Sequence, residues 1–252
     1  ATILFIIGPI DLVVGSMPLF MEADVAVENL KELERRLEAG VTKTSAKPLD
    51  PAAPFVGLQI KDVKYRYPGD HDETAFTLGP INLEVTPGEI LFIVGGNGSG
   101  KSTLLKILTG LYYPTTGEVL VDGSLLERSD YPQYRQSFSA IFTDFFLFDR
   151  LYGVSPAVYD RANELLKWLD ISKKTTFDNG GFTNRNLSTG QRKRLALVAA
   201  LLEERAVYVF DEIAADQDPE FRRRFYEEIL PTVRDQGATV IAVTHDDRYF
   251  KC

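Results

Sequence analysis

The sequence predicts an α/β domain with a mostly parallel sheet, and three observations indicate this fold class. A short apolar run, residues 90–94, passes through a glycine-rich turn into a segment with helical spacing. From residue 138 onward, strand-like and helical segments alternate, which is typical of parallel sheets covered by helices. The chain has 252 residues, of which 44% are hydrophobic, so it can bury a substantial core in one or two domains.

Residues 1–20 form the first element, and their composition predicts a membrane segment. Eleven of the twenty are Ile, Leu, Val or Phe, and Asp11 is the one charged residue among them. Two alternatives stay open: a signal peptide, although no basic stretch precedes the apolar run, and a buried helix of a soluble domain. Asp11 either faces a substrate path or lies at a helix end near the headgroups.

A charged helix is expected from Met21 to Ala39, where Gly40 ends it. One apolar stripe runs along this helix, made by Ala26, Leu30, Leu33 and Leu37. Basic residues on the same segment favour the cytoplasmic side of a membrane.

These features predict that the chain has three parts. Residues 1–39 are expected to be the end of a transmembrane domain, and residues 40–54 a linker that contains Pro, Ser and Thr. Residues 55–252 are expected to form a second domain that is cut at its C-terminus. We therefore expect the chain to be a fragment of a longer polypeptide.

The second domain is expected to begin with strands and to continue with alternating helices and strands. Strands are predicted at residues 58–68, 81–89, 90–94, 114–123, 139–149, 206–212 and 238–245. Helices are predicted at residues 101–110, 155–170, 188–204 and 218–230, the second of them begun by Ser155 and Pro156.

The turn after the apolar run carries a phosphate-binding pattern. Residues 95–102 fit G-x-x-x-x-G-K-[ST], the P-loop pattern, in which glycines let backbone N–H groups surround phosphate oxygens. Lys101 is expected to neutralise the β- and γ-phosphates and the Ser102 hydroxyl to bind Mg²⁺. The nucleotide-binding residues predicted here are Gly95, Asn97, Gly98, Ser99, Gly100, Lys101, Ser102 and Thr103. The ligand is therefore a nucleoside triphosphate.

Two carboxylates end the apolar strand at 206–212. Asp211 lies at the carboxyl end of a strand beside a P-loop, where an acid can hold Mg²⁺ through water. Glu212 is the candidate catalytic base, because a carboxylate there can accept a proton from the attacking water.

The segment 187–191 is the most specific feature of the sequence. Its residues, Leu187, Ser188, Thr189, Gly190 and Gln191, closely resemble the LSGGQ signature of ATP-binding cassette (ABC) ATPases. Basic residues and an apolar helix follow it, as in that family. Ser188 and the Gly190 backbone lie at a helix start, which is a second anion site. The resemblance implies that this segment contacts the γ-phosphate of ATP bound to a second, identical cassette.

The resemblance covers residues 55–250 and implies roles for further residues. It places Tyr67 where an aromatic ring stacks on adenine, although a strand-edge tyrosine is the alternative. It places His245 at the catalytic switch histidine and Asp218, in the stretch Ala215–Asp218, at the aspartate of the D-loop. It also implies the ABC-type nucleotide-binding fold of P-loop NTPases, in which an antiparallel β subdomain and a helical subdomain accompany the parallel sheet.

Two positions depart from the family pattern. Thr143, followed by Asp144, stands where the Q-loop usually carries glutamine. A threonine side chain is too short to repeat the glutamine contact to Mg²⁺ and the attacking water without a bridging water. Thr189 replaces a glycine of the signature, which is a milder change.

The sequence around these motifs resembles that of a subgroup of ABC exporters for cyclic peptides, lipopeptides and pyoverdine-type siderophores. That resemblance implies an ATP-hydrolysing exporter that uses ATP and Mg²⁺, in a bacterial inner membrane, with this domain on the cytoplasmic side. The expected partners are a second copy in a homodimer, the chain's own transmembrane domain and a peptide-like substrate. The alternatives are a soluble ABC ATPase of the ribosome- or DNA-associated type and an importer ATPase.

Charge and cysteine content limit the other function classes. The net charge of −8 argues against a nucleic-acid partner. Cys252 is the single cysteine, which rules out a disulfide within the chain and fits a reducing compartment.

Overall fold

The computed structural model describes residues 2–40, 55–67, 76–151 and 158–249. It divides into two compact units, residues 1–45 and 46–252. Three predictions lie outside the described residues: most of the linker at 40–54, the helix start at Ser155 and Pro156, and Cys252.

The first unit contains a single long helix, α1, Thr2–Gly40. The helix predicted for 21–39 is therefore the second half of an element that begins at residue 2. Leu30 and Leu33 of the predicted stripe are mostly exposed. Among the described residues, α1 included, no helix combines the length and the apolar content needed to span a membrane.

The second unit contains the predicted parallel sheet and a separate antiparallel sheet. The parallel sheet has the order β3 (Ile90–Ile93), β10 (Thr239–Val243), β9 (Val207–Asp211), β6 (Phe138–Ile141). The antiparallel sheet has the order β2 (Thr77–Val85), β1 (Leu58–Arg66), β4 (Thr116–Val121), β5 (Ser124–Leu125). A short hairpin joins β7 (Phe177–Asp178) to β8 (Gly181–Phe182).

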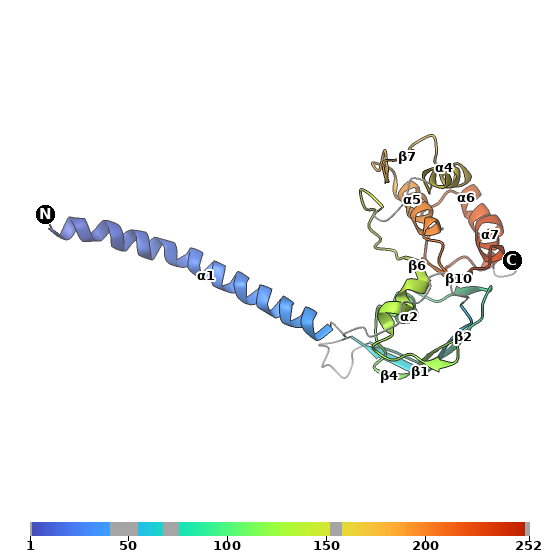
Figure 1. The fold of residues 1–252 in the computed structure, drawn as a ribbon, viewed down its shortest axis with the longest axis horizontal. Helices are drawn as coiled ribbons and strands as arrows, with labels where there is room; N and C mark the ends of the chain where they lie inside the picture. Colours follow the sequence, from blue (N-terminus) through green and yellow to red (C-terminus); the bar gives the residue numbers. More distant parts are fainter. Residues whose placement is uncertain (1, 41–54, 68–75, 152–157, 250–252) are drawn as a thin grey trace. The chain divides into compact units, whose positions relative to one another are not determined.

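Helices accompany both sheets. They are α2 (Lys101–Leu108), α3 (Tyr131–Tyr134), α4 (Val158–Trp168), α5 (Thr189–Leu202), α6 (Pro219–Arg224) and α7 (Leu230–Asp235). Figure 1 shows α4 to α7 on one side of β6 and β10, and the antiparallel strands β1, β2 and β4 on the other. This arrangement is the antiparallel β subdomain and the helical subdomain that the family resemblance implies.

The parallel sheet is the middle layer because its strands are apolar on both faces. In β9, Val207 and Val209 belong to a core shared with the antiparallel sheet and α2. The intervening Tyr208 and Phe210 belong to a second core formed with α4, α5 and the α6–α7 segment. The continuous apolar runs of the sequence therefore mark a sheet that is covered on both sides.

Several predicted elements are wrong in extent. The strand expected at 81–89 is β2, which begins at Thr77 and ends at Val85. The strand expected at 139–149 ends at Ile141, because Ile141 pairs with Phe210 and its partner strand β9 ends one residue later. The N–H of Phe145 then bonds to the Phe142 carbonyl and closes a turn. The helix expected at 218–230 has a π-helical stretch, Phe225–Ile229, between α6 and α7. Pro231 explains this, because it has no N–H for the carbonyl four residues earlier and disturbs the preceding turn.

Candidate nucleotide-binding site

The glycine loop, residues 95–100, connects the end of β3 to the start of α2, as predicted. Gly98 and Gly100 have φ values of +75° and +94°, a left-handed region that glycine adopts without strain. A Cβ at Gly100 would lie 2.6 Å from Leu78 Cδ1, so the end of that β2 side chain would have to shift to accept it. The loop therefore favours glycine at these two positions for its backbone shape.

Lys101 folds back over the glycine loop. Its ammonium donates to the carbonyl oxygens of Gly95 and Gly96, both at 3.0 Å, and the residue is largely buried. The cation is thus held beside the loop's backbone, at the start of a helix whose dipole also attracts anions. This geometry fits a phosphate group.

Ser102 and Asp211 meet although 109 positions separate them in the sequence. The Ser102 hydroxyl donates to Asp211 Oδ2 at 2.8 Å, and Asp211 is buried at the end of β9. A hydroxyl and a carboxylate side by side are the hard oxygen ligands that Mg²⁺ prefers. The donor set therefore fits the predicted metal.

Glu212 and His245 also lie together. Val243 is paired with Asp211 across β10 and β9, so the residues that follow these parallel strands emerge at the same edge of the sheet. His245 Nε2 lies 3.0 Å from Glu212 Oε1. Glu212 has a φ of +55°, a conformation that a residue other than glycine seldom adopts. Such backbone strain is common at functional sites.

Tyr67 reaches the glycine-loop helix from the end of β1. Its hydroxyl lies 2.9 Å from Thr103 Oγ1, and its ring packs edge-on against Tyr65 and Tyr112. The residue is 41% exposed, so part of the ring is available to a ligand. The position beside α2 agrees with an adenine contact, which stays a prediction.

The signature segment, residues 187–191, begins α5. Ser188 Oγ accepts a hydrogen bond from the Gln191 N–H, and Gln191 Oε1 accepts one from the Ser188 N–H, which forms a capping box. Gly190 contacts the loop after β9, where a Cβ would lie 2.6 Å from the Asp216 carbonyl oxygen. Ser188 and Thr189 are exposed. The role of this segment toward a second nucleotide site is therefore a prediction about an exposed helix start.

The D-loop and Q-loop positions lie after β9 and β6. Asp218 is the N-cap of α6, accepting from the Phe221 N–H at 2.9 Å, and it also pairs with Arg194. The Phe221 hydrogen bond, followed by the Arg194 charge, lowers the pKa of Asp218 below its ordinary value. Thr143 and Asp144 are exposed just beyond the end of β6, at the edge of the sheet that carries Asp211.

Sequence reasoning did not assign roles to three polar residues that join α5 to the loop after β9. Lys193 contacts Glu212 and Asp216, Arg194 contacts Gln217 and Asp218, and Gln217 Nε2 donates to the Gly190 carbonyl. A signal for Lys193 existed, because it lies at helical spacing from Leu197 and Ala200 on the apolar face of α5.

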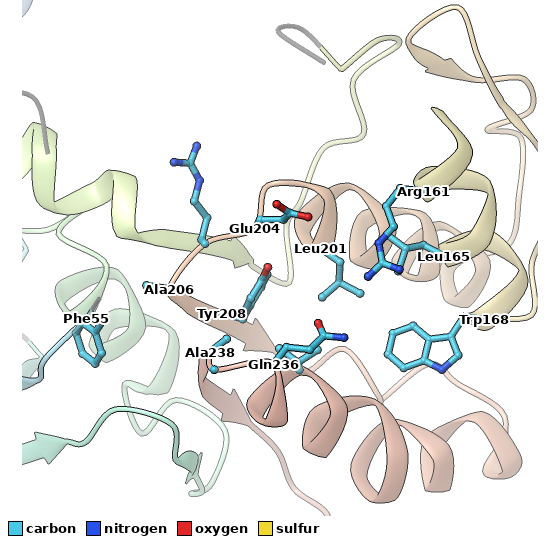
Figure 2. Close-up of a pocket in the computed structure, with 13 residues that line it drawn as sticks. Phe55, Arg161, Leu165, Trp168, Leu201, Glu204, Ala206, Tyr208, Gln236 and Ala238 are labelled. Carbon is cyan, nitrogen blue, oxygen red and sulfur yellow. The ribbon is translucent and has the colours of Figure 1, made fainter. Parts of the chain in front are cut away.

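A cavity of about 390 Å³ lies away from these residues (Figure 2). It is lined by residues near the amino ends of β9 and β10, among them Ala206, Tyr208 and Ala238, with Trp168 from α4. Asp211 and His245, in contrast, lie at or beyond the carboxyl ends of the same strands. The cavity contains none of the predicted site residues.

Known proteins resemble this chain in both sequence and fold. A family model described as "ABC transporter" matches residues 78–215. The chain is 39% identical over 259 aligned residues to the ATP-binding protein SyrD of Pseudomonas syringae pv. syringae, covering 99% of this chain and 46% of SyrD. It is 32% identical to the energy-coupling factor transporter ATP-binding protein EcfA1 of Mycoplasma mobile, covering 75% of this chain and 71% of EcfA1.

A solved structure of a bacterial Atm1-family ABC exporter with ATP bound shares the fold. It has a TM-score of 0.67 at 22% identity and covers 87% of this chain and 40% of the exporter chain. The chain thus spans less than half the length of SyrD and of this exporter. The family match, the glycine loop and the signature helix agree, and the chain belongs to the ABC transporter family, of which it is an ATP-binding ATPase domain.

Proposed function

We propose that this ATPase domain binds ATP with Mg²⁺ between two copies of itself and powers an exporter in a bacterial inner membrane. The contact that carries the nucleotide and metal part of the proposal is the Ser102–Asp211 hydrogen bond at 2.8 Å, next to the Lys101 ammonium. It gathers a hydroxyl, a carboxylate and a cation beside a loop shaped for phosphate.

The surrounding residues have separate tasks in hydrolysis. Ser102 and Asp211 would hold Mg²⁺, which when bound neutralises charge on the phosphate oxygens. Lys101 would exchange one carbonyl partner for a phosphate oxygen. The Glu212 carboxylate would accept a proton from the attacking water. His245, which now bonds to that carboxylate, would turn its ring nitrogen to a γ-phosphate oxygen.

The export of a cyclic peptide, lipopeptide or peptide siderophore is the finer part of the proposal. The similarity to SyrD extends over 99% of the chain and so includes residues that precede the ATPase domain, whereas the match to EcfA1 covers 75%. This supports a layout in which residues 1–39 come from a transmembrane domain on the same polypeptide. The sequence of the motifs around residues 143 and 187 favours the subgroup of exporters for cyclic peptides, lipopeptides and siderophores.

The catalytic part is tested with Glu212→Gln in the full-length protein. We expect ATP binding to persist while the hydrolysis rate falls at least about 100-fold, because the amide cannot accept the proton. The variant is also expected to accumulate as an ATP-bound dimer. Steady-state phosphate release, nucleotide affinity and sedimentation measure these three quantities. Hydrolysis at the wild-type rate would remove Glu212 as the base.

The transport part is tested by deleting the gene that encodes this protein. Peptides and siderophores inside and outside the cells are then compared by mass spectrometry. We expect one such compound to fall in the medium and to be restored by the wild-type gene, with Glu212→Gln as the inactive control. Unchanged secretion of peptide-like compounds would argue for the importer or soluble ATPase alternative.

A further inference from the structure

Lys193 is a buried cation that the nucleotide chemistry described above leaves without a task. It lies on the inner face of α5, five positions after Ser188, and is only 2% exposed. Its helical neighbours on that face, Leu197 and Ala200, are buried apolar residues. A lysine in such surroundings requires partners, because burying an unpaired charge is unfavourable.

Its partners are the two ends of one short turn. The ammonium donates to the Glu212 carbonyl oxygen at 2.8 Å and pairs with Asp216 Oδ2 at 2.6 Å. The residues between them include Ile213 and Ala214, which are buried. Lys193 thus connects the first turns of α5 to both ends of the turn that follows β9.

The backbone conformation at Glu212 affects where its carboxylate points. Glu212 has a φ of +55°, and its N–H makes a long 3.3 Å hydrogen bond to the Val243 carbonyl. The direction of its carboxylate depends on this strained backbone. A hydrogen bond from a buried cation to the carbonyl of the same residue fixes the peptide plane that follows it.

Further contacts join the same two segments. Gln217 Nε2 donates to the Gly190 carbonyl at 2.9 Å, and Arg194 contacts the side chains of Gln217 and Asp218. The signature segment and the 212–218 loop of one chain therefore form one hydrogen-bonded unit. The Glu212 carbonyl also accepts from the Ala215 N–H of its own turn at 3.2 Å, and Lys193 is the contact that reaches this carbonyl from α5.

We propose that Lys193 is a positioning residue for ATP hydrolysis, which orients Glu212 and makes its orientation depend on the placement of the signature helix in the same chain. The inference rests on the proposed role of Glu212 as the base. It also gives a physical route by which a change at the signature segment alters the rate of the chemical step without altering the glycine loop.

The test compares Lys193→Met, Lys193→Arg and Asp216→Asn in the full-length protein. Asp216 is 51% exposed, so it can be solvated when its partner is removed, and the domain is expected to fold. Lys167→Met on the exposed face of α4 is the matched control. For Lys193→Met we expect kcat to fall about 10- to 100-fold, as small misplacements of a catalytic group do. The KM for ATP and the affinity for a non-hydrolysable ATP analogue with Mg²⁺ should stay within about twofold, because the glycine loop is untouched.

The two other variants separate positioning from packing. Lys193→Arg keeps a cation with several donors and should recover most of the kcat, and Asp216→Asn should lose less than Lys193→Met because the Glu212 contact remains. Amide exchange of residues 212–218 should speed up in Lys193→Met and not in Lys167→Met. A wild-type kcat in Lys193→Met, or a loss seen only in nucleotide affinity, would overturn the inference. If the wild-type protein does not hydrolyse ATP, the proposed function is refuted and kcat cannot test the inference. In that case the amide exchange of residues 212–218 tests it, and an unchanged exchange rate in Lys193→Met would overturn the inference.

Discussion

Tyr67 shows how a single side chain can serve the ligand and the fold together. Its ring packs edge-on against Tyr65 and Tyr112, while its hydroxyl contacts Thr103 at the start of α2. The exposed part of the ring is the part that a base would cover. Two roles are possible for this residue. An adenine contact requires the ring and not the hydroxyl, whereas a strand-edge tyrosine requires neither for ATP binding.

Tyr67→Ala is expected to weaken ATP binding by about tenfold, because stacking a base on an aromatic ring contributes about 1–3 kcal/mol. Tyr67→Phe keeps the ring and removes only the hydroxyl, so its ATP affinity should stay near the wild-type value. Calorimetry on both variants with ATP and Mg²⁺ makes the comparison. Equal affinities in all three proteins would favour the strand-edge tyrosine.

At the scale of elements, the start of α6 depends on one carboxylate. Asp218 caps the helix through the Phe221 N–H and also pairs with Arg194 of α5. Its folded-state pKa lies below the ordinary value of 3.8, mainly because of the Phe221 hydrogen bond. The cap therefore contributes fully above about pH 4, and the contribution is lost as the pH falls through the lowered pKa.

Asp218→Ala is expected to lower the free energy of unfolding by about 1 kcal/mol at pH 7, as the loss of an N-cap does. The difference from wild type should shrink below the ordinary pKa. Denaturant unfolding at pH 7 and pH 3 measures it. Asp235→Ala is the control, because this exposed residue pairs with the neighbouring Arg234 at the surface and its removal should cost less than about 0.5 kcal/mol at either pH. An equal Asp218→Ala effect at both pH values would argue against the carboxylate as the cap.

At the scale of the whole molecule, the proposed site needs two chains. The signature segment contacts the 212–218 loop of its own chain through Gly190 and Gln217, and Ser188 is exposed. In the proposed dimer, the glycine loop of one copy faces the signature segment of the other. Each nucleotide site would then combine residues from both copies.

Complementary variants test this arrangement. Lys101→Ala disables a glycine loop and Ser188→Arg disables a signature segment, so each variant alone should be inactive. A dimer of one copy of each would keep one intact site and lose the other. Random mixing makes half of the dimers mixed, so ATPase activity should return to about a quarter of the wild-type value. No recovery on mixing, despite exchange of subunits, would show that the two motifs act within one chain.

Local patterns in the sequence were sufficient to predict the parallel strands, the glycine loop and the signature helix. The apolar runs at 90–94, 206–212 and 238–245 became β3, β9 and β10, because strands covered on both faces need continuous apolar sequence. The glycine loop could be predicted because its positive φ angles tolerate few residue types. The end of β6 at Ile141 was missed, because strand length is set by the partner β9 and not by local composition.

The sequence by itself determined the family, the ligand and the residues that belong to each motif, because these depend on short runs of neighbouring residues. Only the tertiary structure decided which groups from distant runs meet. It brought Ser102 to Asp211, His245 to Glu212 and Lys193 to the Glu212 carbonyl. For the first two pairs the physical reason is the parallel pairing of β3, β10 and β9, which places three separate chain segments at one edge of the sheet. Lys193 reaches Glu212 because α5 packs in one core with Tyr208 and Phe210 of β9.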